Sequence, residues 1–252
     1  MKTFRADLHI HTVLSPCGDL EMSPVNIVDR AAELGLDIIG ITDHNSTRQC
    51  EVTKRLASRK GIKVLCGAEV TTREEAHCLA FFETSETLND FQQFLDEHLP
   101  KILNDVDKFG YQLAVDEEDN IMHEEEYLLI SALDVSLNDL EQKIHSLNGI
   151  FIPAHVDKSK FSLTSQLGFI PPDLNADALE LSKFSTPETF KKNNPFAQSF
   201  SYIQSSDAHY IEHIGNVYTC FEMESRSFEE IKMALKGLEG RKVFTSVKTE
   251  EH

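Results

Sequence analysis

The stretch Asp7-Leu8-His9-Ile10-His11 (residues 7–11) ends the first hydrophobic run of the chain, which extends from Thr3 to Ile10. Successive side chains of a β-strand point to opposite faces of a sheet, so Asp7, His9 and His11 would share one face. Two imidazoles on one face can converge on a single metal ion. A His-x-His pair alone is more often two half-exposed strand histidines, so its interpretation depends on the rest of the chain.

The composition is typical of one cytoplasmic domain. The chain has 252 residues, of which 40% are hydrophobic, and no shift in composition marks a linker, so we expect a single domain over residues 1–252. The net charge of −18 repels polyanions, which argues against stable binding of duplex nucleic acid. Five scattered cysteines fit a reducing cytosol. No signal peptide or membrane-spanning run is found, so we expect a cytoplasmic protein without a membrane partner.

Strand and helix patterns alternate along the chain. Ser23 as N-cap and Pro24 at the first helical position begin a helix that ends before Gly35. A second helix is expected over 47–58 and a last one over 227–240. Hydrophobic runs predict strands over 3–10, 37–42, 63–70, 76–82, 149–154, 177–181 and 199–205, with an edge strand over 217–221. Repeated parallel βαβ units favour an α/β barrel, whose active site forms at the carboxyl ends of the strands.

Residues 84–149 differ in character and are expected to form an insert within the barrel. Apolar residues from Leu88 to Phe109 recur at helical spacing, which predicts one amphipathic helix with a break at Pro100. Asp116 to Tyr127 contains seven acids in twelve residues, which is typical of a solvated loop. A further helix over 137–147 returns the chain to the barrel.

Six of the eleven histidines stand at predicted strand ends or on the strand 76–82, together with three carboxylates. They are His9, His11, His44, His77, His155 and His209, with Asp19, Glu69 and Asp207. Imidazole and carboxylate ligands suit zinc, manganese or iron, and six histidines exceed what one tetrahedral ion needs. The sequence therefore predicts a site for more than one metal ion. The other histidines that we interpret as structural or surface residues include His98, His145 and His252, whereas His213 lies near His209 and could support it.

At this point the chain resembles the PHP (polymerase and histidinol phosphatase) family of metal-dependent phosphoesterases. The motifs that carry the resemblance span residues 7–209: Asp7-Leu8-His9-Ile10-His11-Thr12, Ile41-Thr42-Asp43-His44, Gly67-Ala68-Glu69, His77, Pro153-Ala154-His155 and Ser206-Asp207-Ala208-His209. The resemblance implies a distorted (β/α)7 TIM-like barrel that holds two or three divalent ions at the carboxyl ends of its strands.

The resemblance also implies a ligand set for each ion. One ion would be held by His9, His11, Glu69 and Asp207. Glu69 would bridge to a second ion held by His77 and His155. A third would be held by Asp19, His44 and His209. The chain departs from many relatives in that Val156 rather than proline follows His155, and Asp19 is preferred to Glu21 as the ligand from the first loop.

The predicted chemistry follows from the ions. A hydroxide held between two cations is a good nucleophile at neutral pH, and the cations neutralise charge that develops on the phosphoryl oxygens. The residues placed in catalysis are Glu69, His44, Asp207 and His209, with Asp43 orienting His44. Cations after strand ends would bind the phosphate; the candidates are Arg48, Lys158, Lys160 and Lys183.

Several functions share this site. The acidic surface and compact size favour a phosphomonoesterase acting on a small phosphorylated metabolite or nucleotide. The first alternative is a phosphodiesterase that trims short single-stranded RNA or DNA, although we find no cluster of basic residues interleaved with aromatics. A metal-dependent amidohydrolase and a non-catalytic metal-binding module are further alternatives. The sequence does not identify the substrate, the metal or the oligomeric state.

Overall fold

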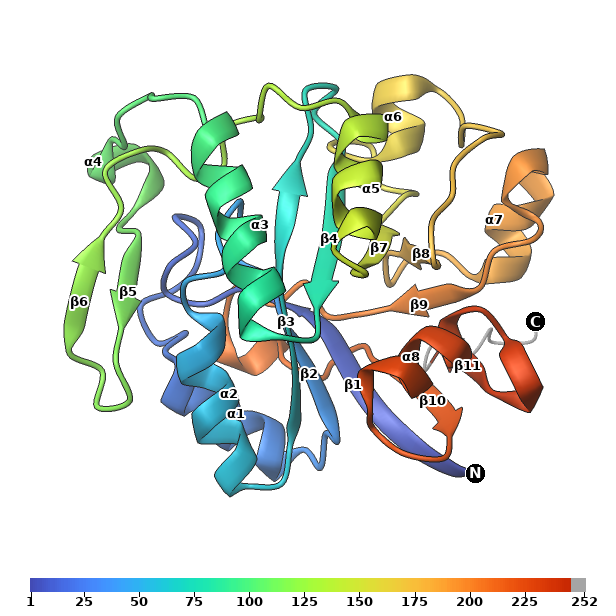
Figure 1. The fold of residues 1–252 in the computed structure, drawn as a ribbon, viewed down its shortest axis with the longest axis horizontal. Helices are drawn as coiled ribbons and strands as arrows, with labels where there is room; N and C mark the ends of the chain where they lie inside the picture. Colours follow the sequence, from blue (N-terminus) through green and yellow to red (C-terminus); the bar gives the residue numbers. More distant parts are fainter. Residues whose placement is uncertain (246–252) are drawn as a thin grey trace.

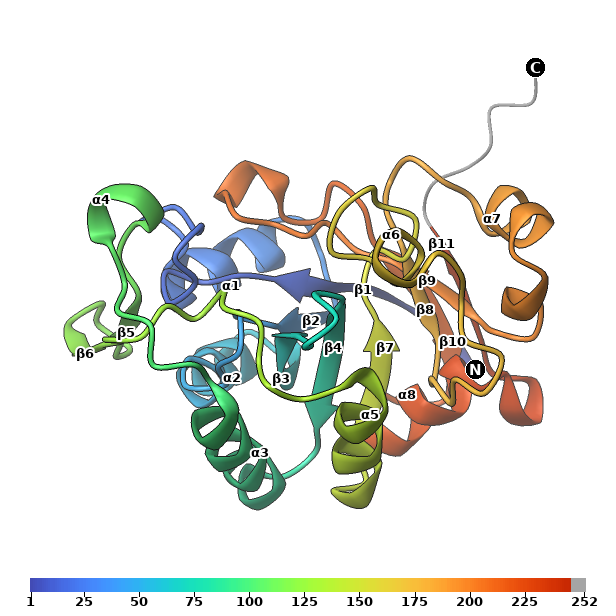
Figure 2. The same cartoon turned by 90° about the horizontal axis from the view of Figure 1, so that it is seen from above.

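A computed structural model describes residues 1–245, so His252 and the end of the expected single domain lie outside the described residues. The centre of the fold is a seven-stranded sheet in the order β11-β10-β1-β2-β3-β4-β7. Its strands are β1 (Lys2–Ile10), β2 (Ile38–Ile41), β3 (Lys63–Thr71), β4 (His77–Phe82), β7 (Ile150–Pro153), β10 (Thr219–Met223) and β11 (Lys242–Thr245). The sheet curls strongly into a half-barrel (Figure 1, Figure 2). This confirms the α/β fold predicted as a distorted TIM-like barrel.

A separate parallel pair of short strands lies beside both ends of the curled sheet. The strands are β8 (Leu179–Leu181) and β9 (Tyr202–Gln204). Strand β8 contacts β7, and β9 contacts β11. The pair therefore spans the interval that the seven-stranded sheet leaves between its two outermost strands.

Helices cover the outer face of the sheet (Figure 2). Helix α1 (Pro24–Glu33) begins as predicted, because the Ser23 side chain accepts a hydrogen bond from the Asn26 N–H and Pro24 occupies the first turn. Helices α2 (Cys50–Arg59), α3 (Ser85–His98) and α5 (Leu137–Ser146) pack on β3, β4 and β7, whereas α8 (Phe228–Leu235) packs on β10 from the other face of the sheet. The remaining helices are short: α4 (Val106–Phe109), α6 (Leu163–Leu167), α7 (Pro187–Asn193) and 3₁₀ turns at Pro195–Ala197, Ile211–His213 and Leu238–Gly240.

Alternation along the strands divides the core into two layers. On β4, Cys78 and Ala80 join the layer under the outer helices, whereas Leu79 and Phe81 join the layer that also holds α8. Gly67 allows β3 and β4 to approach closely, because a Cβ there would lie 1.8 Å from the Ala80 carbonyl oxygen. The two buried layers fix the register of the strands, and with it the side chains at their ends.

The expected parallel βαβ units are present from β1 through β2 to β3, which pair in parallel, but the expectation is wrong for the step from β3 to β4. The two strands pair antiparallel, with Thr71 opposite His77. A turn closed by the hydrogen bond from the Thr72 N–H to the Ala76 carbonyl joins them, and this connection is far too short for a parallel crossover. His77, at the start of β4, therefore lies at the same end of the sheet as the last residues of β3.

The insert also differs from its prediction. The expected long helix ends at His98 before Pro100, and only the short α4 follows. The expected acidic loop contains a hairpin of β5 (Leu113–Val115) and β6 (Ile121–Glu124), which lies at the left of Figure 1. Ion pairs of Arg55 and Arg59 with Glu117 offset part of its negative charge. The predicted edge strand over 217–221 is likewise internal, since β10 pairs with both β1 and β11.

The state of the cysteines and the length of the helices bear on two expectations from the sequence. All five cysteines are free, and Cys17 is the exposed one among them. Within residues 1–245 every helix is too short or too polar to cross a lipid bilayer.

Candidate metal centre

Glu69, near the end of β3, lies at the centre of the site. Its side chain is almost fully buried, and ring nitrogens of five histidines lie 2.9–3.4 Å from its two carboxylate oxygens. These histidines are His9, His11, His44, His77 and His155. The structure thus brings together the predicted ligands from β1, the loop after β2, the start of β4 and the end of β7.

Asp207 and His209 approach this centre from the loop after β9. Asp207 Oδ1 lies 3.5 Å from the Nε2 atoms of both His9 and His11. The His209 ring stacks on the His11 ring with centroids 4.1 Å apart. Asp207 has a φ of 53°, in the left-handed region where a non-glycine residue is strained, so the surrounding structure holds this loop in place.

Three groups of three ligand atoms lie close enough together to hold an ion each. They are His9, His11 and Glu69; His44, Glu69 and His77; and His11, His44 and His209. The first and second groups share Glu69, as expected of a bridging carboxylate. In the second group His44 stands where His155 was predicted, and in the third group His11 stands where Asp19 was predicted.

The hydrogen bonds of His11 fit a bound cation. Ser15 Oγ donates its one proton to Asp43 Oδ1 over 2.7 Å. Towards His11 Nδ1, 3.0 Å away, Ser15 Oγ can therefore only accept a hydrogen bond. The proton of His11 is therefore on Nδ1, and the lone pair of Nε2 faces Glu69 Oε2 at 3.4 Å and Asp207 Oδ1 at 3.5 Å. A lone pair that faces two carboxylates needs a cation or a donor beside it, and in the chain itself that donor is His9 Nε2, 3.2 Å from His11 Nε2.

His44 supports the same conclusion. Its Nδ1 atom is buried 3.2 Å from Glu69 Oε2 and has no hydrogen-bond partner within the part of the chain that the structure describes. Burial, with repulsion from His11 second, holds the pKa of His44 well below its usual value. Burial also lowers the pKa of His11, to about 3. Both imidazoles are thus neutral at pH 7, which is the form that binds metal.

The carboxylates and His9 complete the charge balance. Burial would raise the pKa of Glu69, but His77 and His9 outweigh it and hold that pKa well below its usual range. Burial would lower the pKa of His9, but Glu180, Glu69 and Asp207 raise it well above its usual value. In the absence of metal ions, a second proton on His9 thus neutralises part of the negative charge of these carboxylates. Metal binding to His9 must displace that proton.

Glu180, on β8, is a site residue that the sequence reasoning missed. Its Oε2 atom lies 3.0 Å from His9 Nδ1 and accepts the His155 backbone N–H over 3.0 Å. It fixes the proton of His9 on Nδ1, which leaves Nε2 for a metal. The signal that could have found it is a glutamate between leucines in a buried strand, since a charge there needs a partner.

Other predicted residues lie at varying distances from the cluster. Asp19 is joined to it through its backbone, whose N–H donates to the His209 carbonyl, and its Oδ1 accepts the Glu21 N–H over 2.8 Å. Its assignment as a ligand stays a prediction. Asp43 was expected to orient the His44 ring, but its carboxylate accepts a hydrogen bond from Ser15 instead. Ser15 in turn contacts the His11 ring and accepts the His44 backbone N–H.

A cavity of about 670 Å³ opens beside the cluster, and three predicted substrate residues border it or its neighbour. Lys158 and Lys160 line this cavity. Lys183 lines an adjoining cavity of about 270 Å³, which Lys158 also borders. Lys158 Nζ pairs with Asp207 Oδ2. Arg48 lies elsewhere, in ion pairs with Asp96 and Glu125.

Two family models match the chain. Residues 7–153 match the PHP domain, and residues 199–238 match the PHP-associated family. The uncharacterized protein YqxK of Bacillus subtilis is 25% identical over 98% of this chain and 65% of its own length. The chain thus spans less than two thirds of this longer relative.

Solved structures share the fold. The lesion-specific endonuclease PfuEndoQ of Pyrococcus furiosus superposes with a TM-score of 0.72 at 21% identity, over 96% of this chain and 58% of that one. A two-domain protein of Bacteroides vulgatus that contains a predicted PHP-like metal-dependent phosphoesterase gives 0.55 at 18% identity, over 97% and 64%. The match of the PHP domain to more than half of the chain, together with this fold and the cluster around Glu69, shows that the chain belongs to the PHP family of metal-dependent hydrolases.

Proposed function

We propose that this protein is a metal-dependent phosphoesterase that hydrolyses a phosphate monoester of a small metabolite or nucleotide. The observation that carries the proposal is the convergence of ring nitrogens from five histidines, His11 and His44 among them, on the buried Glu69 carboxylate at 2.9–3.4 Å. This arrangement suits two or three divalent ions of zinc, manganese or iron. Bound ions of this kind lower the pKa of water and stabilise charge on phosphoryl oxygens.

The residues of the chain prepare the site for that chemistry. Glu180 orients His9, and Ser15 orients His11, so both rings present Nε2 to the centre of the cluster. Lys158 places a cation at the side of the cluster that opens to the cavity. A phosphoryl group in the cavity would therefore lie between the cluster and the Lys158 ammonium, and its negative charge would be balanced from two sides.

Size and charge favour a small monoester. A cavity of about 670 Å³ is within the range of small-molecule sites. The net charge of −18 opposes the approach of a long polyanion. We expect the site to accept one phosphoryl group and a compact leaving group.

A panel assay tests this proposal. Protein loaded with Zn²⁺, Mn²⁺ or Fe²⁺ would be incubated with nucleoside monophosphates, sugar phosphates, an aminoalcohol phosphate and N-acyl amino acids, and released phosphate or amine would be measured. Phosphate release from at least one monoester, absent after chelation, is expected. Amine release without phosphate release would point instead to the amidohydrolase alternative.

A nuclease is the second candidate function. The likeness to the endonuclease PfuEndoQ over 96% of this chain favours it, as do three lysines at the two adjoining cavities. Single-stranded oligonucleotides and a duplex with an abasic site belong in the same panel. Cleavage of these without release of phosphate from any monoester would replace the first proposal with the second.

A further inference from the structure

Two phenylalanines stand exposed in the cavity beside the metal cluster. The Phe184 side chain is 84% exposed and that of Phe161 is 44% exposed, and both line the cavity of about 670 Å³ that also reaches Glu69. We call these two residues the aromatic wall. Exposed apolar surface next to a polar catalytic cluster is typical of a ligand-binding surface.

Phe161 is held firmly in this position. Its carbonyl accepts the His77 N–H over 2.9 Å, and its ring stacks on the His77 ring with centroids 4.9 Å apart and planes 12° apart. Its φ of 55° is rare for a bulky residue and costs conformational energy. The chain thus accepts strain to keep an aromatic ring against a predicted metal ligand.

Phe184 lies on a loop that is tied down on both sides. The buried Gln204 donates from Nε2 to the Ser182 carbonyl over 2.7 Å and to the Ser185 carbonyl over 3.0 Å. Asp157 accepts the Ser182 N–H over 2.7 Å and its hydroxyl over 2.6 Å. The exposure of Phe184 is therefore a property of an ordered loop.

Polar and cationic groups accompany the aromatic wall. Lys183 Nζ lies 5.4 Å from the centre of the Phe184 ring. The hydroxyl residues Ser159, Ser182 and Ser185 line the same cavity. An acyl chain would need an enclosed apolar pocket, whereas rings, hydroxyls and cations together match the base, sugar and phosphate of a nucleotide.

We infer that the substrate is a nucleoside phosphate, whose phosphoryl group lies at the His/Glu cluster and whose base stacks on the aromatic wall, with Phe184 as the main contact. This inference rests on the proposed phosphoesterase function. Because stacking on an aromatic ring is tolerant of sequence, the ligand is either a free nucleotide or the terminal nucleotide of a single strand.

Matched ligands and variants test the inference. Phosphate release would be measured with adenosine 5′-monophosphate, ribose 5-phosphate and a short 5′-phosphorylated single-stranded oligonucleotide, for the wild type and Phe184→Ala, Phe184→Leu and Phe184→Tyr. Phe196→Ala is the control, since Phe196 is 55% exposed but does not line the cavity. Binding of adenosine 5′-monophosphate to metal-free protein, seen as upfield shifts of the base protons, gives a second readout.

The aromatic ring should matter only to ligands with a base. Phe184→Ala and Phe184→Leu should raise KM for at least one base-bearing ligand roughly fivefold or more, while Phe184→Tyr and Phe196→Ala change it little. In Phe184→Ala and Phe184→Leu, KM for ribose 5-phosphate should change less than KM for the base-bearing ligand. The upfield shifts should disappear in Phe184→Leu.

The outcomes separate the inference from the function on which it rests. Dependence on Phe184 with the mononucleotide assigns a free nucleotide as the source of the ligand, and dependence only with the oligonucleotide assigns a strand end. If the protein releases phosphate from both ribose 5-phosphate and nucleotides, and Phe184→Leu changes KM equally for both, the inference is overturned but the proposed phosphoesterase function stands. No phosphate release by the metal-loaded wild type from these ligands or from any other monoester of the panel above would overturn both, and release from those other monoesters alone would overturn only the inference.

Discussion

The Nδ1 atom of His9 lies 3.0 Å from the Oε2 atom of Glu180, a contact that joins residues 171 positions apart in the chain. Both groups are buried. The carboxylate keeps the proton of His9 on Nδ1, so that Nε2 faces Glu69 and Asp207. A residue outside the predicted ligand set thus determines how the first predicted ligand is presented.

Glu180→Gln should weaken metal binding while the fold is kept. The amide cannot fix the imidazole proton as a carboxylate does, and loss of such a partner lowers metal affinity about 10- to 100-fold. Competition with a chelating dye measures the affinity, and Glu83→Gln, which changes an exposed acid after β4, is the control. Equal affinity in Glu180→Gln and Glu83→Gln would show that Glu180 does not act on the metal site.

Ser15→Ala should both destabilise the protein and reduce metal affinity. Ser15 Oγ joins Asp43 to the His11 ring, and its removal leaves a buried carboxylate and a buried imidazole each without one partner. Such a loss costs about 1–3 kcal/mol of the free energy of unfolding. Urea unfolding with and without metal measures both effects. Ser159→Ala, at an exposed position, should change neither.

Asp7 should make the stability of the metal-free protein depend on pH. Burial raises its pKa from 3.8 to about 6, although hydrogen bonds from Ser206 and Gly215 oppose this. The folded state therefore holds the proton more tightly than the unfolded state, and the contribution of Asp7 falls as pH rises through about 4 to 6. It levels off above about pH 7, where Asp7 is ionised in both states.

The variant Asp7→Asn isolates this contribution. The free energy of unfolding of the wild type minus that of Asp7→Asn should fall by about 1 kcal/mol between about pH 5 and about pH 7. Denaturant unfolding in the presence of a chelator gives both values. A difference that is constant, or that grows with pH, would contradict the raised pKa of Asp7.

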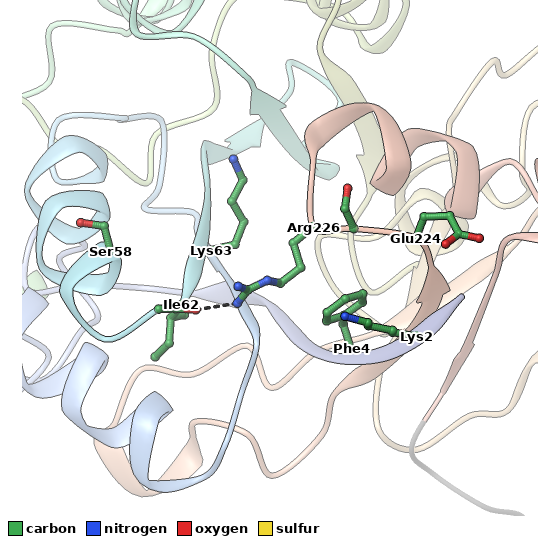
Figure 3. Close-up of a pocket in the computed structure, with 9 residues that line it drawn as sticks. Lys2, Phe4, Ser58, Ile62, Lys63, Glu224 and Arg226 are labelled. Atoms are coloured by element: carbon green, nitrogen blue, oxygen red, sulfur yellow. Dashed lines mark hydrogen bonds between the residues drawn. The ribbon is translucent and has the colours of Figure 1, made fainter.

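Lys158→Met should raise KM for the phosphate substrate roughly tenfold, because a charge-assisted contact to a phosphoryl group is lost. Lys63→Met is the control. Lys63 lines a separate cleft with Lys2, Phe4 and Arg226 (Figure 3). Because Lys63 starts β3 and Glu69 lies near the other end of that strand, this cleft is remote from the metal cluster. Steady-state kinetics at saturating metal measures both variants, and equal KM values would remove Lys158 from the phosphate site.

The predicted ligands came together because strand ends can be recognised in the sequence. His9, Glu69 and His155 each follow or end a buried hydrophobic run, and the curled sheet brings such ends to one place. His77 was placed correctly near this group even though its strand runs antiparallel, because the short turn before it returns the chain to the same end.

Other features depend on contacts that no local pattern contains. The position of Glu180 between two leucines indicates that the carboxylate needs a buried partner, but it does not identify that partner as His9 on β1, far away in the sequence. The hairpin β5–β6 was hidden by its acidic composition, which the ion pairs with α2 partly offset. In the sequence nothing distinguishes Phe161 and Phe184 from other loop residues. Their two loops come together through the hydrogen bonds between Asp157 and Ser182.

Metal stoichiometry in the wild type and in Glu69→Gln tests the central claim most directly. Equilibrium dialysis against Mn²⁺ or Zn²⁺, followed by elemental analysis, should give two or three ions per wild-type chain and phosphate release that depends on them. Glu69→Gln should bind at least one ion fewer and lose turnover, while its circular dichroism stays that of the wild type. A wild-type chain that binds no ion tightly, or a Glu69→Gln variant with normal metal content and activity, would contradict the account.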